Sequence, residues 1–99
     1  MSQSFENKTE KGKDFSHLDL KKHEFIGCVF EGCNFTESDF SDSKFSECIF
    51  KECNFSNTKI AGCKFLDCEF NGCKVIGLKF NLINPFLLSI RFNECVIKT

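Results

Sequence analysis

Phenylalanine recurs every five residues through most of this 99-residue chain. Twelve of the fourteen phenylalanines stand at multiples of five, and three other such positions hold the large apolar residues Leu20, Ile60 and Val75. A second series of mostly small residues lies two positions before the large ones, and it includes seven of the eight cysteines. From Leu18 to Phe80 the chain therefore repeats a unit of small, polar, large, polar, polar about thirteen times.

A five-residue period fits neither regular secondary structure. On an α-helix, successive phenylalanines would be rotated by about 140° and would cover the whole circumference. On a continuous strand, whose side chains alternate with a period of two, they would fall on opposite faces. The pattern instead predicts a solenoid of short extended segments, each of which holds its small and large residue on one side. Gly, Asn and Asp are frequent two positions after the large residue, from Gly27 to Gly77, where each segment is expected to turn.

Copies such as CNFTE, SDFSD, CIFKE and CEFNG resemble the pentapeptide repeat proteins, whose consensus is Ala or Cys, Asp or Asn, Leu or Phe, and two variable residues. The resemblance covers residues 18–80 without interruption. It implies an all-β fold, a right-handed quadrilateral β-helix with four repeats and twenty residues in each coil, and about four coils in all. The small and the large residues would point into this coil.

The cysteines could bind a metal, form disulfides or pack as thiols. In twenty-residue coils they would form two stacks with a spacing of about 4.8 Å: Cys28, Cys48 and Cys68, then Cys33, Cys53 and Cys73. The five-residue spacing is compatible with structural zinc. Equivalent positions hold Ser38, Ser43 and Thr58, however, and desolvation strongly disfavours a thiolate among phenylalanine rings. We therefore expect packed thiols in a reducing compartment, with no metal and no cofactor.

The repeat changes character at the N-terminal end of the chain. Residues 1–14 keep only Phe5 in phase and are rich in Lys, Glu and Asn. This composition predicts a polar tail, or a cap over the first coil, followed by the β-helix proper over residues 15–80.

A second irregularity follows Phe80. Pro85 stands where a large inward residue belongs and has no N–H for the ladder between coils, so we expect a loop or bulge over residues 81–89. The rhythm resumes two residues out of phase over residues 90–99. The stretch NPFLLSIRFNEC resembles a segment of longer bacterial members related to the Qnr quinolone-resistance proteins.

Charge and hydropathy indicate a cytoplasmic protein. Thirteen Lys and Arg oppose fourteen Asp and Glu, so no strong field favours nucleic acid or an anionic membrane. No apolar run approaches the ~18 residues of a membrane span, and the first residues lack the apolar segment of a signal peptide. We expect neither a nucleic-acid nor a membrane partner.

The sequence does not predict an enzyme. His23 precedes Cys28 by one repeat, and a Cys with a nearby His is the minimal nucleophilic pair. No third orienting group and no phosphate-binding glycine loop accompany it. A histidine near the end of the solenoid is the simpler interpretation, and we assign no catalytic residue.

Two kinds of protein partner remain open. Members such as Qnr and the mycobacterial MfpA imply a rod that resembles B-form DNA and binds a type II topoisomerase, DNA gyrase or topoisomerase IV. The charge is dipolar rather than strongly acidic, with eight acids against five bases in residues 1–40 and three against five in residues 61–99. The alternative is a structural or protein-interaction module that binds an unknown protein. Its contact surface would be four outward apolar residues at one corner of the coil: Ile26, Val29, Ile49 and Leu66.

The last repeats predict a self-association surface. Ile97 occupies an inward position two residues before Thr99, so the final coil is expected to expose apolar side chains and unpaired backbone groups. An isologous contact between two such coils would close on itself. We therefore predict an end-to-end homodimer through Ile90, Phe92 and Ile97.

Overall fold

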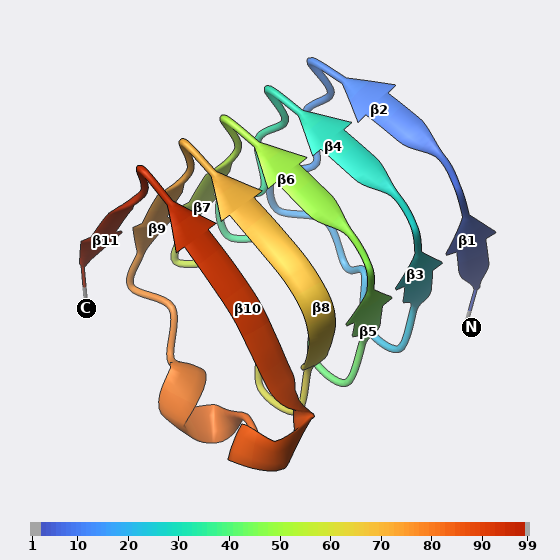
Figure 1. Ribbon diagram of the computed structural model, residues 1–99, viewed down its shortest axis with the longest axis vertical. Coiled ribbons are helices and arrows are strands. Elements are labelled where there is room, and N and C mark those ends of the chain that lie inside the picture. Colours follow the sequence, from blue (N-terminus) through green and yellow to red (C-terminus); the bar gives the residue numbers. More distant parts are fainter. Residues whose placement is uncertain (1–2, 99) are drawn as a thin grey trace.

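The structure is a computed structural model that describes residues 3–98. Residues 1–2 and 99, at the ends of the predicted segments 1–14 and 90–99, lie outside the described residues. The chain winds into a right-handed parallel β-solenoid of about five turns (Figure 1), one more than the four expected. Its strands are β1 (Ser4–Glu6), β2 (Thr9–Lys11), β3 (Glu24–Ile26), β4 (Val29–Glu31), β5 (Lys44–Ser46), β6 (Ile49–Lys51), β7 (Asn54–Ser56), β8 (Lys64–Asn71), β9 (Lys74–Ile76), β10 (Leu88–Asn93) and β11 (Val96–Lys98). Two 3-10 helices, η1 (Phe80–Leu82) and η2 (Pro85–Leu87), separate β9 from β10.

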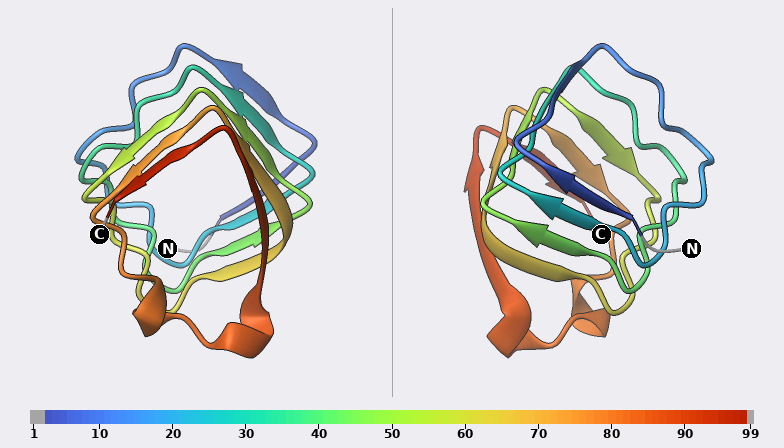
Figure 2. Two further views of the ribbon diagram at one scale, coloured as in Figure 1. Left: turned by 60° about the vertical axis from the view of Figure 1, so that its left-hand side comes forward. Right: turned by 90° about the vertical axis from the view of Figure 1, so that its right-hand side faces the viewer.

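Consecutive coils pair in parallel with a register of twenty residues through most of the chain. Phe25 is the partner of Phe45, and Phe45 is the partner of Phe65. The larger sheet has the order β1-β3-β5-β8-β6-β4-β2, with β10 also paired to β8, and the second sheet has the order β11-β9-β7. Viewed toward the end of the rod, the coils superpose as a four-sided outline (Figure 2). The quadrilateral β-helix implied by the family resemblance is therefore confirmed.

The interior is a stack of phenylalanine rings. Within a column the rings are nearly parallel, as for Phe25 and Phe45, whose centroids are 4.9 Å apart with an interplanar angle of 7°. Between columns the rings meet edge to face, as for Phe30 and Phe35 at 5.5 Å and 80°. Offset stacking and edge-to-face contacts are the arrangements that the ring quadrupole favours. The large residues at multiples of five from Phe25 to Val75 are all buried.

A left-handed backbone conformation makes every regular corner. A positive φ recurs at each fifth residue from Asn7 to Gly77 without exception. All six glycines of the chain stand at these corners, which is expected because glycine adopts this conformation without a steric penalty. The corners at Glu37, Glu47 and Glu52 adopt it with a side chain that does not favour it.

Residues 3–14 are wound as the first coil of the solenoid. β1 pairs with β3 so that Phe5 faces Phe25, and β2 pairs with β4 so that Glu10 faces Phe30. The sequence analysis described residues 1–14 as a polar tail or a cap over the first coil, and the structure winds residues 3–14 as a coil of their own. Their polar composition coexists with regular coiling because backbone hydrogen bonds between coils do not depend on the side chains.

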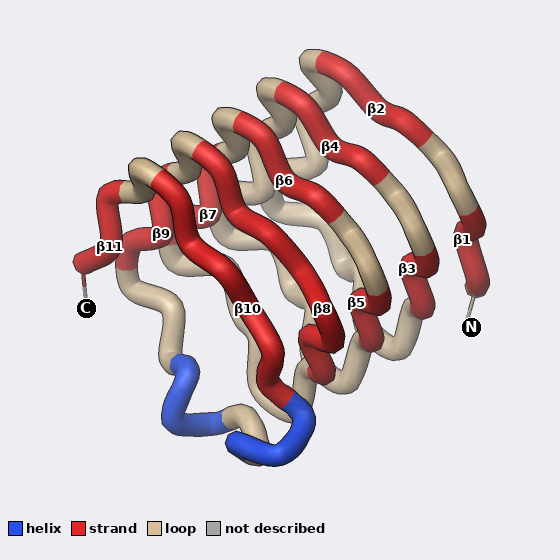
Figure 3. Tube along the Cα trace, in the orientation of Figure 1, coloured by secondary structure: helices blue, strands red, loops and turns tan. Residues whose placement is uncertain are grey.

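The chain leaves the rod between β9 and β10. η1 and η2 project from one corner of the last coil (Figure 3). After this excursion Phe92 is the partner of Phe70 and Ile97 is the partner of Val75, so the register has changed from twenty to twenty-two residues. The two additional residues are absorbed at this corner, and the inward ladder continues beyond it. No helix in the described range is long and apolar enough to cross a membrane.

Candidate functional site

The small inward residues are hydrogen-bond donors as well as spacers. The Cys53 thiol lies 3.3 Å from the carbonyl oxygen of Phe30, twenty-three residues earlier, and the Ser43 hydroxyl lies 2.7 Å from the carbonyl oxygen of Leu20. Other members of the series repeat the same geometry: Cys28, Cys33, Cys48, Thr58, Cys63, Cys68 and Cys73. Each donor satisfies a carbonyl that points toward the interior. The sequence analysis inferred that these inward residues must be small. The structure shows that they also donate hydrogen bonds to backbone carbonyls.

Two of the buried thiols, Cys28 and Cys63, are poorly suited to nucleophilic chemistry. All eight cysteines are free, and seven are buried. Burial raises the pKa of the Cys63 thiol from 9.0 to about 12, and burial also raises the pKa of Cys28. The thiolate is the reactive and metal-binding form, and this environment disfavours it. Residues 3–98 contain no group of three or more His, Cys, Asp or Glu side chains arranged to hold a metal ion.

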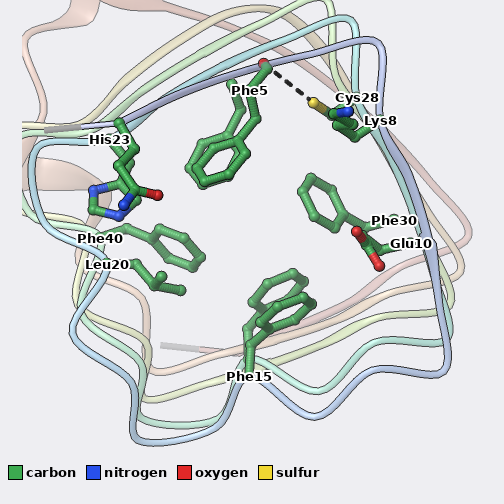
Figure 4. A pocket seen from close by; sticks show the side chains of 12 residues that line it. Phe5, Lys8, Glu10, Phe15, Leu20, His23, Cys28, Phe30 and Phe40 are labelled. Carbon is green, nitrogen blue, oxygen red and sulfur yellow. Dashed lines mark hydrogen bonds between the residues drawn. The ribbon is translucent and has the colours of Figure 1, made fainter.

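The first coil surrounds a hollow of about 160 Å³ whose walls are mainly phenylalanine rings (Figure 4). His23 and Cys28 both line it, but they are not hydrogen bonded to each other. His23 Nδ1 lies 2.8 Å from the Lys21 carbonyl oxygen, and Cys28 Sγ lies 3.5 Å from the Phe5 carbonyl oxygen. The two side chains that could have formed a nucleophilic pair are therefore each engaged with backbone.

The four apolar residues of the predicted corner surface flank the corners at Gly27, Glu47 and Asp67. Val29 pairs with Ile49 in the next coil, whereas Ile26 and Leu66 are separated by Ser46. All four side chains are half-buried. The structure thus brings them to one corner, but a serine and two acidic corner residues interrupt the apolar surface.

The predicted association residues lie in the last described coil. Ile90 is half-buried, Phe92 is 36% exposed and Ile97 is 48% exposed. Their inward positions follow from pairing with Cys68, Phe70 and Val75. The homodimer itself stays a prediction.

Among the side chains that the structure describes, the most exposed large apolar one was missed by the sequence analysis. Phe86 is 93% exposed in η2, and Leu82 at the end of η1 is 51% exposed. Asn84 caps η2 by accepting a hydrogen bond from the Phe86 backbone N–H at 3.0 Å, and Pro85 occupies the first turn. One sequence feature could have indicated this exposure: Phe86 and Phe92 are the two phenylalanines outside the five-residue repeat.

Comparison with known proteins matches this architecture. Residues 23–99 match the family described as a pentapeptide repeat region. Full-length QnrB1, a plasmid-mediated fluoroquinolone resistance protein, has a TM-score of 0.72 and 34% identity over 78% of this chain and 39% of its own. HetL, a pentapeptide repeat protein involved in heterocyst differentiation regulation in the cyanobacterium Nostoc sp. strain PCC 7120, has a TM-score of 0.83 with 14% identity, over 94% of this chain and 39% of HetL. No curated protein sequence matched the chain.

This chain spans 39% of the length of each of these two solved structures. The family match, in contrast, covers most of the chain, and it includes the register change and the final coil. The chain belongs to the pentapeptide repeat family.

Proposed function

We propose that this protein is a non-enzymatic, cytoplasmic interaction module, a β-helical rod that presents side chains to another protein. Phe86 carries the proposal, because a phenylalanine that is 93% exposed gains much from burial in a partner. Aromatic side chains are the typical anchors of protein interfaces. The Asn84 cap and Pro85 hold the backbone of η2, so binding would order little additional chain.

The packing of the β-helix that carries η2 supports this interaction role. Within residues 3–98, twenty apolar residues form one continuous buried core, and every buried side-chain N or O atom in this range has a hydrogen-bond partner. A fully satisfied, close-packed support keeps a projecting loop in a defined place. The corner surface of Ile26, Val29, Ile49 and Leu66 is a second, less exposed contact region within the same proposal.

Binding to a type II topoisomerase, DNA gyrase or topoisomerase IV, is the second candidate. Its support is the 34% identity to a fluoroquinolone resistance protein. The dipolar distribution of charge along the rod favours it less than an acidic surface would.

Site-specific crosslinking tests the first candidate. A photoreactive phenylalanine analogue at position 86 is expected to yield one defined protein adduct in cells of the source organism, whereas the same analogue at the exposed position of Lys51 should not. Identical adducts from both positions, or none from position 86, would contradict the proposal. The second candidate predicts that the purified chain restores supercoiling by fluoroquinolone-inhibited gyrase, and no restoration would eliminate it.

A further inference from the structure

The hollow inside the first coil lies beside a position where the aromatic interior lacks a ring. The inward column that begins in β2 reads Glu10, Phe30, Phe50 and Phe70 in successive coils. Every other multiple of five from position 5 to position 80 holds Phe, Leu, Ile or Val. Glu10 is thus the one charged side chain of this inward series, and its column has a carboxylate in place of the first ring.

The neighbouring columns show what is absent at this position. Phe5 stacks on Phe25 with ring centroids 5.3 Å apart and an interplanar angle of 16°. Phe15 stacks on Phe35 at 5.2 Å and 7°. Among the described residues, no ring of the first coil stacks on Phe30, which Phe15 meets only edge to face at 6.3 Å. A ring inside the hollow would therefore find in Phe30 an aromatic neighbour without a stacking partner from this coil.

The size and the lining of the hollow suit one aromatic ring. Its volume is about 160 Å³, and an apolar cavity of about 150 Å³ is large enough to bind benzene. Five of the lining residues are buried members of the core: Phe25, Cys28, Phe30, Phe35 and Phe40. Contact between a ring and such side chains is favourable through burial and through the ring quadrupoles.

The charged group that faces this space is a carboxylate. Glu10 is half-buried, and its side chain lies beside Phe30 at the edge of the hollow (Figure 4). Lys8 also lines the hollow, but its side chain is exposed, so its ammonium group is hydrated. His23 Nδ1 is engaged with the Lys21 carbonyl oxygen at 2.8 Å. The hollow therefore combines an aromatic lining with one partly desolvated anion.

We propose that this hollow binds a small aromatic cation, a single ring with an ammonium group on a short arm. The ring lies against Phe30, and the ammonium group donates a hydrogen bond to the Glu10 carboxylate. The surrounding rings also favour a cation, because their faces carry partial negative charge. The site is in the first coil and Phe86 is in η2, so this ligand-binding activity is additional to the proposed interaction function.

Titration of the full chain with benzylammonium, followed by NMR of the aromatic side chains, tests the proposal. We expect saturable shifts of the Phe5, Phe25 and Phe30 ring resonances, and nuclear Overhauser contacts from the ligand ring to Phe30. Benzyl alcohol has the same ring without the charge and should bind about tenfold more weakly, because it cannot form the charge-assisted hydrogen bond to Glu10. Tetramethylammonium has the charge without the ring and should cause no saturable shift.

Two substitutions at position 10 separate the charge from the space. Glu10→Gln retains the hollow and should remove the tenfold preference for benzylammonium over benzyl alcohol. Glu10→Phe supplies the missing ring and should abolish the binding of both probes. The matched control is Glu6→Gln, which changes an exposed acid of the same coil outside the hollow and should retain the original affinities. Unchanged amide resonances in the later coils show that each variant is folded.

Several results would overturn the inference. The first is the absence of any saturable shift with benzylammonium, and the second is equal affinity of the original chain for benzylammonium and benzyl alcohol. Equal benzylammonium affinity of Glu10→Gln and the original chain would exclude the role of the carboxylate. Binding retained by Glu10→Phe would place the ligand outside the hollow. Tetramethylammonium bound as tightly as benzylammonium would show that no ring is recognised.

Discussion

The Cys48 thiol lies 3.3 Å from the carbonyl oxygen of Phe25 and donates a hydrogen bond to it from one coil to the preceding coil. Both residues are buried, so the carbonyl has no access to bulk water. This relationship links the two inward series of the repeat: the small residue fills the space between rings and also satisfies the backbone of the large one.

Cys48→Ala should therefore destabilise the fold beyond the loss of packing. Loss of the thiol's hydrogen bond to the Phe25 carbonyl costs about 1 kcal/mol, whereas Cys48→Ser retains a donor of the kind that Ser43 already provides. In urea unfolding, the original chain should be the most stable, the Ser variant less stable and the Ala variant the least stable. An Ala variant as stable as the Ser variant would show that the position requires only a small residue.

Phe50→Ala should unfold much of the population. Phe50 is fully buried and stacks between Phe30 and Phe70, at centroid distances of 5.3 and 4.7 Å. Removal of a buried phenylalanine costs about 3–5 kcal/mol out of a typical total of about 5–15 kcal/mol. The matched control is Lys51→Ala at the adjacent exposed position, which should be nearly silent in thermal unfolding monitored by circular dichroism. Equal stability of the two variants would refute the inward assignment.

Replacing an acidic corner residue by glycine should stabilise the fold. Glu47 has a φ of 53°, and Glu47→Gly relieves the left-handed strain while it increases the entropy of the unfolded chain. We expect a net gain of about 0.5 kcal/mol in the free energy of unfolding. A loss of stability would mean that the Glu47 side chain stabilises the corner.

Two glycine corners provide a contrast. Gly62 has a φ of 73°, and a Cβ there would meet the Asp42 side chain of the preceding coil, whereas a Cβ on Gly32 would meet nothing within 4 Å. Gly62→Ala should therefore cost more than Gly32→Ala in chemical denaturation, although both carry the backbone penalty. Equal costs would show that Asp42 moves aside freely.

Alkaline pH should destabilise the fold through the thiols. The pKa of Cys63 is about 12 in the folded chain, against an ordinary value of 9.0. Because the folded state retains the proton, stability is fully present below pH 9 and is lost as pH rises from 9 to 12. Denaturant midpoints should be flat between about pH 6 and 8 and should fall above about pH 9. A midpoint that rises in that range would contradict the burial of neutral thiols.

Much of this fold follows from periodicity. The spacing of Phe30, Phe35 and Phe40 excludes a helix and a continuous strand, and it places each ring inside a turning chain. The four sides and the handedness depended on the family resemblance, because a five-residue repeat does not specify how many segments close a coil. The coiling of residues 3–14 was not predictable, because Lys8 and Glu10 are unexpected at inward positions.

The candidate sites were less predictable than the fold. The sequence predicted that Ile26 and Leu66 lie at one corner of the coil. It did not predict that Ser46, in the coil between them, separates the two side chains. The exposure of Phe86 depends on how the chain absorbs two additional residues, which is decided by pairing between distant strands.

Between β9 and β10 the chain takes up two additional residues, buries Ile83, displays Phe86 at the surface and leaves the inward ladder intact. Nuclear Overhauser contacts between inward side chains are the decisive test of this arrangement. We predict contacts from Phe92 to Phe70, whose ring centroids are 5.3 Å apart, and from Ile97 to Val75. Contacts from Ile90 to Phe70, with the original register of twenty residues, would contradict it, because the last coil would then contain no outward excursion.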